Sequence, residues 1–61
     1  MGKSKFEVYE DFAGEHRFRL LAGNGEIIAV SEGYVSKAAC TVGIDSVKKN
    51  AFNAEIVEVK E

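Results

Sequence analysis

The dipeptide Asn24-Gly25 most strongly constrains how this chain folds, because it separates two segments in which apolar and polar residues alternate. Both residue types tolerate the positive φ angles of a type I′ turn, which joins two antiparallel strands through two residues. Residues 15–22 and 26–32 are therefore predicted to form a hairpin. The predicted register pairs Gly23 with Glu26 and Leu21 with Ile28.

A second hairpin is predicted one step earlier in the chain. Residues 5–11 alternate with period two, as residues 15–22 do. Between them, Asp11-Phe12-Ala13-Gly14 fits a type I turn followed by a glycine in the left-handed region, a common three-residue hairpin loop. The loop pairs Asp11 with Glu15, which sets Phe6 opposite Leu20, Val8 opposite Phe18, Glu7 opposite Arg19 and Tyr9 opposite Arg17. The last two pairs offer an ion pair and a cation–aromatic contact.

The two hairpins share one strand and form a three-stranded antiparallel meander with unlike faces. Its core face carries the apolar residues Phe6, Val8, Phe18, Leu20, Ala22, Ile27 and Ala29. On the reverse face, Leu21, Ile28 and Val30 form an apolar island among charged residues. A patch of this kind on a monomer often marks a contact site. We therefore expect a partner or a second copy to touch Tyr9, Leu21, Ile28 and Val30.

An amphipathic helix and a short strand are predicted after the meander. Ser36 is well placed to cap a helix that ends near Asn50. The apolar stripe of this helix consists of Ala39, Cys40, Gly43, Ile44, Val47 and Ala51. A glycine within a helix, such as Gly43, lowers helix stability by about 1 kcal/mol relative to alanine. We therefore expect that glycine is needed at this position because the helix approaches the sheet closely there. Residues 55–60 predict a final strand, so the expected fold is α+β with the order βββαβ.

The length of the chain makes this unit marginal as a monomer. Residues 1–61 are expected to form one domain, and a domain of this size buries only about 60% of its unfolded surface. Cys40 is the only cysteine and His16 the only histidine, which excludes an internal disulfide and a zinc site of Cys and His. Association is the remaining route to stability, so we expect homodimerisation to complete the fold.

The charge of the chain bears on its partners and location. A net charge of −2 argues against a protein that acts mainly on nucleic acid. The alternative, a nucleic-acid-binding accessory protein, would use Arg17, Arg19, Lys37, Lys48 and Lys49. The alternation of side chains along the strand argues against this alternative. Phe18 points to the face opposite Arg17 and Arg19, so it cannot stack on a base beside them. No apolar run is long enough to span a membrane and the first residues do not resemble a signal peptide, so we expect a cytoplasmic protein without membrane contact.

His16 and Cys40 are the two candidates for catalytic groups. His16 and Glu10 are expected across the first hairpin, where they would make an acid–base couple. A histidine hydrogen-bonded to a neighbouring carboxylate is much commoner, and no nucleophile accompanies this pair. Cys40 lies in the apolar stripe of the helix, where an inert buried thiol is typical. We expect no enzyme activity, no cofactor and no metal.

The start of the predicted helix is a candidate anion contact. Tyr34, Ser36 and Lys37 stand there, beside free backbone amides and the positive end of the helix dipole. Capping by Ser36 and packing by Tyr34 explain the same residues without a ligand. The first hypothesis for function is thus a non-enzymatic homodimeric module that uses its reverse sheet face or helix start to contact a partner protein or small anion.

Several stretches resemble the YegP-like family of small bacterial proteins of unknown function. They are residues 14–20, Asn24-Gly25-Glu26, Ser31-Glu32-Gly33-Tyr34, Ser36-Lys37-Ala38 and residues 43–48. His16 and Gly23 depart from the family pattern, which tends to have a large aromatic at the first position and a small residue such as serine at the second. The resemblance implies a strand-strand-strand-helix-strand unit that often occurs as two tandem copies. Since this chain holds one copy, the resemblance also implies a homodimer, and it carries no established activity or cofactor.

Overall fold

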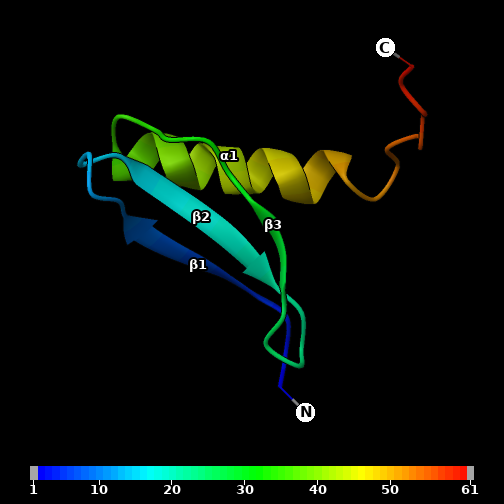
Figure 1. Ribbon diagram of the computed structural model, residues 1–61, viewed down its shortest axis with the longest axis horizontal. Helices are drawn as coiled ribbons and strands as arrows, with labels where there is room; N and C mark the ends of the chain where they lie inside the picture. The colour runs from blue at the N-terminus through cyan, green and yellow to red at the C-terminus, as the bar shows by residue number, and fades with distance from the viewer. Residues whose placement is uncertain (1, 61) are drawn as a thin grey trace.

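The computed structural model describes residues 2–60 and contains an antiparallel sheet of three strands with one helix across it (Figure 1). The strands are β1 (Lys5–Glu10), β2 (His16–Leu21) and β3 (Ile27–Val30), and they lie in the order β1-β2-β3. The helix α1 (Lys37–Asn50) follows them. This confirms the predicted α+β class, the meander and the single helix.

The first hairpin has the predicted loop and register. Asp11 N donates to Glu15 O at 2.9 Å, and Gly14 N donates to Asp11 O at 3.0 Å. Gly14 has φ of +83°, the left-handed conformation that this loop requires of its last residue. The cross-strand partners are those expected from the sequence and include Phe6 with Leu20, Val8 with Phe18 and Glu10 with His16.

The second turn differs from the predicted type I′ turn. Among the described residues only glycines have positive φ, so Asn24 does not adopt the left-handed conformation. Gly25 does, with φ of +92°, while Gly25 N donates to Ala22 O and Ala22 N donates to Glu26 O. The turn is thus a second copy of the three-residue loop, and the side chain of Asn24 accepts a hydrogen bond from Glu26 N.

The longer loop changes the register of β3 at its start. Leu21 pairs with Ile27 instead of the predicted Ile28, whereas Leu20 pairs with Ala29 as expected. The mismatch is absorbed by a bulge, in which Ile28 is the extra residue. The predicted pairs are therefore correct beyond the bulge and wrong next to the turn.

Ser36 caps the helix as predicted. Its backbone is extended, and its Oγ accepts a hydrogen bond from Ala39 N at 3.0 Å. Lys48 and Lys49 lie in the last turn, where positive charge complements the helix dipole. At 14 residues α1 is too short to cross a bilayer, and it is the one helix that residues 2–60 contain.

The core lies between α1 and β2 and is small. Phe18, Cys40 and Ile44 are 5%, 0% and 8% exposed, and Phe6, Tyr34 and Val47 pack against them. A Cβ on Gly43 would lie 2.8 Å from Cζ of Tyr34 and 3.4 Å from the ring of Phe18. The space beside Gly43 is thus filled mainly by the side chain of Tyr34, which lies outside the three strands, and only secondarily by Phe18 of the sheet, to which the close approach was predicted.

Part of the predicted core face is not buried. Val8, Ile27 and Ala29 are exposed although the sequence pattern assigned them to the core. The physical reason is that α1 packs over β2 and leaves the outer strands uncovered. At Ile27 the bulge adds to this, because the residue is paired with Leu21 on the reverse face.

The predicted strand at residues 55–60 is absent. Residues 54–60 have no regular structure and extend away from the sheet (Figure 1). Ile56 is 99% exposed, and Val57 and Val59 are exposed with it. A strand needs a neighbour to satisfy its backbone, and α1 directs this tail away from both edges of its own sheet. The βββα part of the expected order is thus confirmed and the last β is wrong for the single chain.

Replacing Gly43 with alanine tests the contact between helix and sheet. Overpacking against Tyr34 and Phe18 costs about 1–3 kcal/mol, which outweighs the ~1 kcal/mol gained in helix propensity. We expect Gly43→Ala to lower the free energy of unfolding by about 1 kcal/mol in urea titrations. Asp45→Ala, at an exposed position of the same helix, is the control. An alanine variant at position 43 more stable than this control would contradict the packing described.

Candidate interaction surface

The reverse face of the sheet carries two arginines of β2, and both are engaged by carboxylates. Arg19 Nε donates to Glu7 Oε1 at 2.8 Å, which confirms the ion pair expected from the register. Arg17 Nε donates to Asp11 Oδ2 at 2.6 Å. The cation–aromatic contact expected between Arg17 and Tyr9 is instead made by Arg19, 4.8 Å from the ring centre. Tyr9 is therefore contacted by Arg19, its diagonal neighbour on β2, while the side chain of Arg17 points toward Asp11 of the loop.

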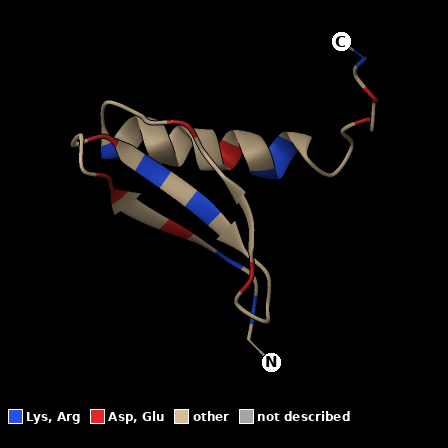
Figure 2. Cartoon of the chain, viewed as in Figure 1, with Lys and Arg blue, Asp and Glu red and all other residues tan. Residues whose placement is uncertain are grey.

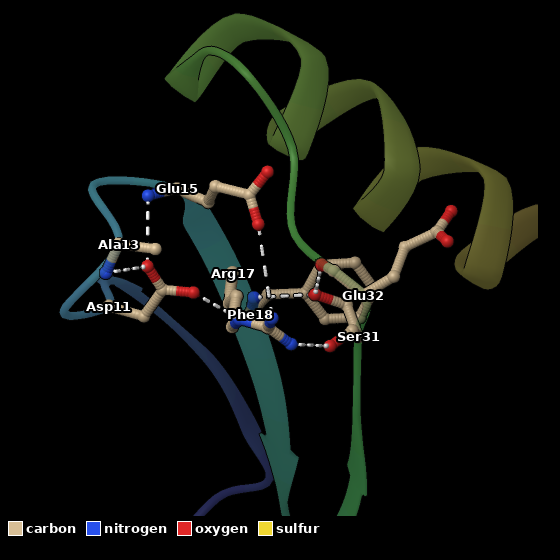
Figure 3. A network of polar contacts seen from close by, with 7 residues as sticks. All are labelled: Asp11, Ala13, Glu15, Arg17, Phe18, Ser31 and Glu32. Atoms are coloured by element: carbon tan, nitrogen blue, oxygen red, sulfur yellow. Dashed lines mark hydrogen bonds and ion pairs between the residues drawn. The ribbon is translucent and has the colours of Figure 1, made fainter.

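Asp11 joins the first loop to the middle strand (Figure 3). Its Oδ1 accepts hydrogen bonds from Ala13 N and Glu15 N, both at 2.9 Å. The hydrogen bond from Arg17, followed by that from Glu15 N, lowers the pKa of the Asp11 carboxyl below its ordinary value. The same contact raises the pKa of Arg17. The first position of a type I turn favours aspartate for this reason, a signal that sequence reasoning had available and did not use.

Ser31 extends the network to the end of β3 (Figure 3). Arg17 Nη1 donates to Ser31 O at 3.1 Å, and Phe18 N donates to Ser31 Oγ at 2.9 Å. The serine hydroxyl thus takes the place of a backbone acceptor where the chain leaves the ladder. Asp11, Arg17 and Ser31 together hold the loop, β2 and the chain after β3 in one arrangement.

The cations proposed for nucleic-acid binding do not form one surface. Arg17 and Arg19 lie on the sheet face away from the helix, each beside a carboxylate. The lysines at positions 37, 48 and 49 lie on α1, in the other layer of the fold (Figure 2). A groove that tracks a phosphate backbone needs cations that are contiguous and free. Arg17, Arg19, Lys37, Lys48 and Lys49 are not arranged in this way.

The predicted contact residues of the reverse face remain largely accessible. Ile28 and Val30 are 60% and 55% exposed, while Leu21 and Tyr9 are half-buried. Val30 pairs with Arg19, next to the Tyr9 ring. The bulge removes Ile28 from its expected place opposite Leu21. On the reverse face Ile27 takes this place beside Leu21, so the island consists of Leu21, Ile27 and Val30.

The residues at the start of the helix serve the fold. The ring of Tyr34 stacks on Phe18 with 6.3 Å between centres, and its backbone exchanges two 2.8 Å hydrogen bonds with His16. The hydroxyl of Ser36 is occupied by its capping bond, and Lys37 is exposed. Two of the three candidate anion contacts are thus engaged by packing or capping.

His16 and Cys40 do not converge on a pocket. Cys40 is completely buried in the core, and His16 is bonded through its backbone to Tyr34. Glu10 stands opposite His16 as predicted, at the end of the hairpin. The packing of Cys40 and the backbone pairing of His16 are structural roles.

An open groove that sequence reasoning missed lies on the helix side of the sheet. It is lined by Ser4, Lys5, Phe6, Leu20, Ile44 and Lys48. Lys48 Nζ lies 5.9 Å from the centre of the Phe6 ring. The groove exists because α1 covers β2 and leaves the inner side of β1 open, an offset that no periodicity in the sequence records.

The pairing of Asp11 with Arg17 should appear as acid sensitivity of the fold. A carboxyl whose pKa is lower folded than unfolded stabilises above its unfolded pKa, and this contribution is lost as the pH falls through the folded pKa. We expect the thermal midpoint to fall below about pH 4. Asp11→Asn, which keeps an oxygen for the loop amides, should show a smaller fall, and Asp45→Asn on the outer helix surface should behave as wild type. If the thermal midpoint of Asp11→Asn fell at acidic pH as steeply as that of the wild type, this role of Asp11 would be excluded.

Comparison with known proteins places the chain in a family. The family model described as "Domain of unknown function (DUF1508)" matches residues 11–58. A UPF0339 protein from Treponema denticola is 62% identical over 55 residues, which cover 90% of this chain and 95% of that relative. A UPF0339 protein from Stutzerimonas stutzeri is 61% identical over 46 residues, 75% of this chain and 41% of that longer relative.

A solved structure of the same architecture comes from Haloferax volcanii. That solution structure has a TM-score of 0.87 and 47% sequence identity, and the match covers 97% of this chain and 100% of that one. The expected YegP-like membership is confirmed, and the family extends beyond bacteria to archaea. The chain belongs to the DUF1508 family, whose members include the UPF0339 proteins.

Proposed function

We propose that this protein is a non-enzymatic homodimeric interaction module, in which two copies cover each other's helix-side groove. The observation that carries this proposal is the exposed area of the chain. The single chain exposes 5166 Å², whereas a compact monomer of its mass exposes about 3,900 Å². The surplus of about 1,300 Å² exceeds the ~800 Å² that each partner contributes to an interface of standard size.

The shape of the chain supports the same conclusion. Its radius of gyration is 13.1 Å, against about 10.5 Å for a compact domain of this length. Among residues 2–60, the side chains of Phe18, Cys40 and Ile44 are the buried ones, which is little to offset the conformational entropy lost when the sheet and helix become ordered. A second copy would supply the missing cover.

The C-terminal tail is the segment that best fits the groove. As an extended strand, it would place Val57 and Val59 on one face, where they could meet Phe6, Leu20 and Ile44. Glu55, on the same face of this strand, would bring negative charge toward Lys48 at the rim. Paired along the free edge of β1 in the partner, the tail would become the strand that its sequence pattern predicts. The longer Stutzerimonas stutzeri relative has room for a second unit, as a tandem arrangement requires.

Sedimentation equilibrium at micromolar concentration tests the proposed dimer. We expect the 6.7 kDa chain to sediment with twice its mass. Val57→Asp with Val59→Asp should shift the population to monomers, because two charges would enter the apolar groove. Val35→Asp and Val42→Asp, at equally exposed positions outside the tail and groove, are the matched controls. A folded monomer of wild type at these concentrations would refute the dimer, and tail variants that still dimerise would refute this docking.

A charge reversal tests the docking of the tail separately. Lys48→Glu should weaken dimerisation about five- to ten-fold at low salt, because like charges would face each other across the groove rim. Adding Glu55→Lys to the same chain should restore dimerisation, whereas adding Glu58→Lys, on the opposite face of the strand, should not. Lys37→Glu, at the opposite end of α1, should have no effect. Loss of dimerisation in Lys48→Glu without recovery in the double variant Lys48→Glu with Glu55→Lys would argue against this pairing.

A further inference from the structure

The outer edge of β3 is an unpaired and apolar strand edge. β3 ends the sheet, and its four residues are Ile27, Ile28, Ala29 and Val30. Ser31 N donates to Phe18 O, so Ser31 faces β2. Because successive residues of an antiparallel strand face opposite sides, the amide and carbonyl of Val30 point outward. The edge therefore presents backbone hydrogen-bonding groups beside exposed apolar side chains.

This edge lacks most of the features that protect natural sheet edges. Such edges usually carry a lysine, a proline or an inward-pointing charge. β3 has none of these, and its bulge lies at the end next to the turn, opposite Leu21. The other end is fixed, because Ser31 is held by both Arg17 and the amide of Phe18 (Figure 3). An edge held in place in this way would lose little entropy when it pairs.

The surroundings of the edge are acidic. Glu26 and Glu32 flank β3 and are both exposed, and residues 22–36 contain no lysine or arginine (Figure 2). The nearest cations, Arg17 and Arg19, are already paired with Asp11 and Glu7. An apolar edge between two carboxylates is complementary to an extended segment that is apolar in its middle and basic at its ends.

We propose that β3 binds an extended segment of a partner protein as a fourth antiparallel strand, by main-chain pairing at Val30 and charge pairing at Glu26 and Glu32. This mode of recognition adds a strand to an exposed sheet edge, with affinity from the backbone and specificity from alternate side chains. The segment it fits has β-branched residues at its centre and lysine or arginine at both ends. The site lies on the edge opposite β1, so it does not depend on the dimer proposed above.

A synthetic nonapeptide tests this site on the full chain. The probe has two lysines at each end and alternating valine and threonine between them, and binding is followed by amide chemical shifts. We expect saturable shifts at Ile28, Val30 and Ser31, with slower solvent exchange of the Val30 amide. Peptides with glutamate in place of lysine, or with proline at the centre, should bind at least roughly ten-fold more weakly. Equal binding of the glutamate peptide, or shifts confined to the groove residues Phe6 and Ile44, would overturn the proposal.

Variants of the protein separate the two parts of the recognition. The double variant Glu26→Lys with Glu32→Lys changes exposed side chains only. It should weaken binding of the lysine peptide by roughly ten-fold or more and strengthen binding of the glutamate peptide. Val30→Lys should abolish binding, whereas Val42→Lys, on the exposed side of α1, should leave it unchanged. Wild-type affinity in both edge variants would overturn the proposal. The proposal would also be overturned if the Val30 amide were protected from solvent exchange in peptide-free protein and this protection increased with protein concentration. The edge would then be paired with a second copy of the chain.

Discussion

The packing of α1 on β2 is the contact on which the rest of the structure depends. Phe18 from the strand meets Cys40 and Ile44 from the helix, and the absence of a side chain at Gly43 lets Tyr34 enter between them. Because this contact is centred on the middle strand, the inner side of β1 stays open, and the helix does not cover the outer edge of β3, which ends the sheet. The offset thus produces the helix-side groove, and it leaves the terminal strand β3 uncovered.

The sequence predicted the elements whose causes are local. Period-two alternation and a glycine at the last loop position determined the first hairpin and its register, and Ser36 marked the start of the helix. The second hairpin was misread for a reason within the turn: Gly25 alone took the left-handed conformation, and Asn24 used its side chain to accept from Glu26 N. One additional loop residue was enough to move Ile28 out of its predicted pair.

The remaining errors concern contacts between distant segments. Nothing in the pattern of α1 says which strand it will cover, so the exposure of Val8 and the groove beside Phe6 could not be foreseen. Likewise, residues 55–60 have the composition of a strand, but α1 carries them away from both free edges of their own sheet. Arg17 illustrates the same limit on a smaller scale, since its choice of Asp11 over Tyr9 depends on the geometry of the loop.

Hydrogen exchange of the tail amides tests most directly whether a second copy completes this fold. In a dimer completed by exchanged tails, the amides of residues 56–59 exchange slowly at high protein concentration and faster on dilution, together with the amides of β1 that face its free edge. If the tail exchanges as an unstructured segment at every concentration while β2 and α1 remain protected, the chain is stable by itself and the central claim is wrong.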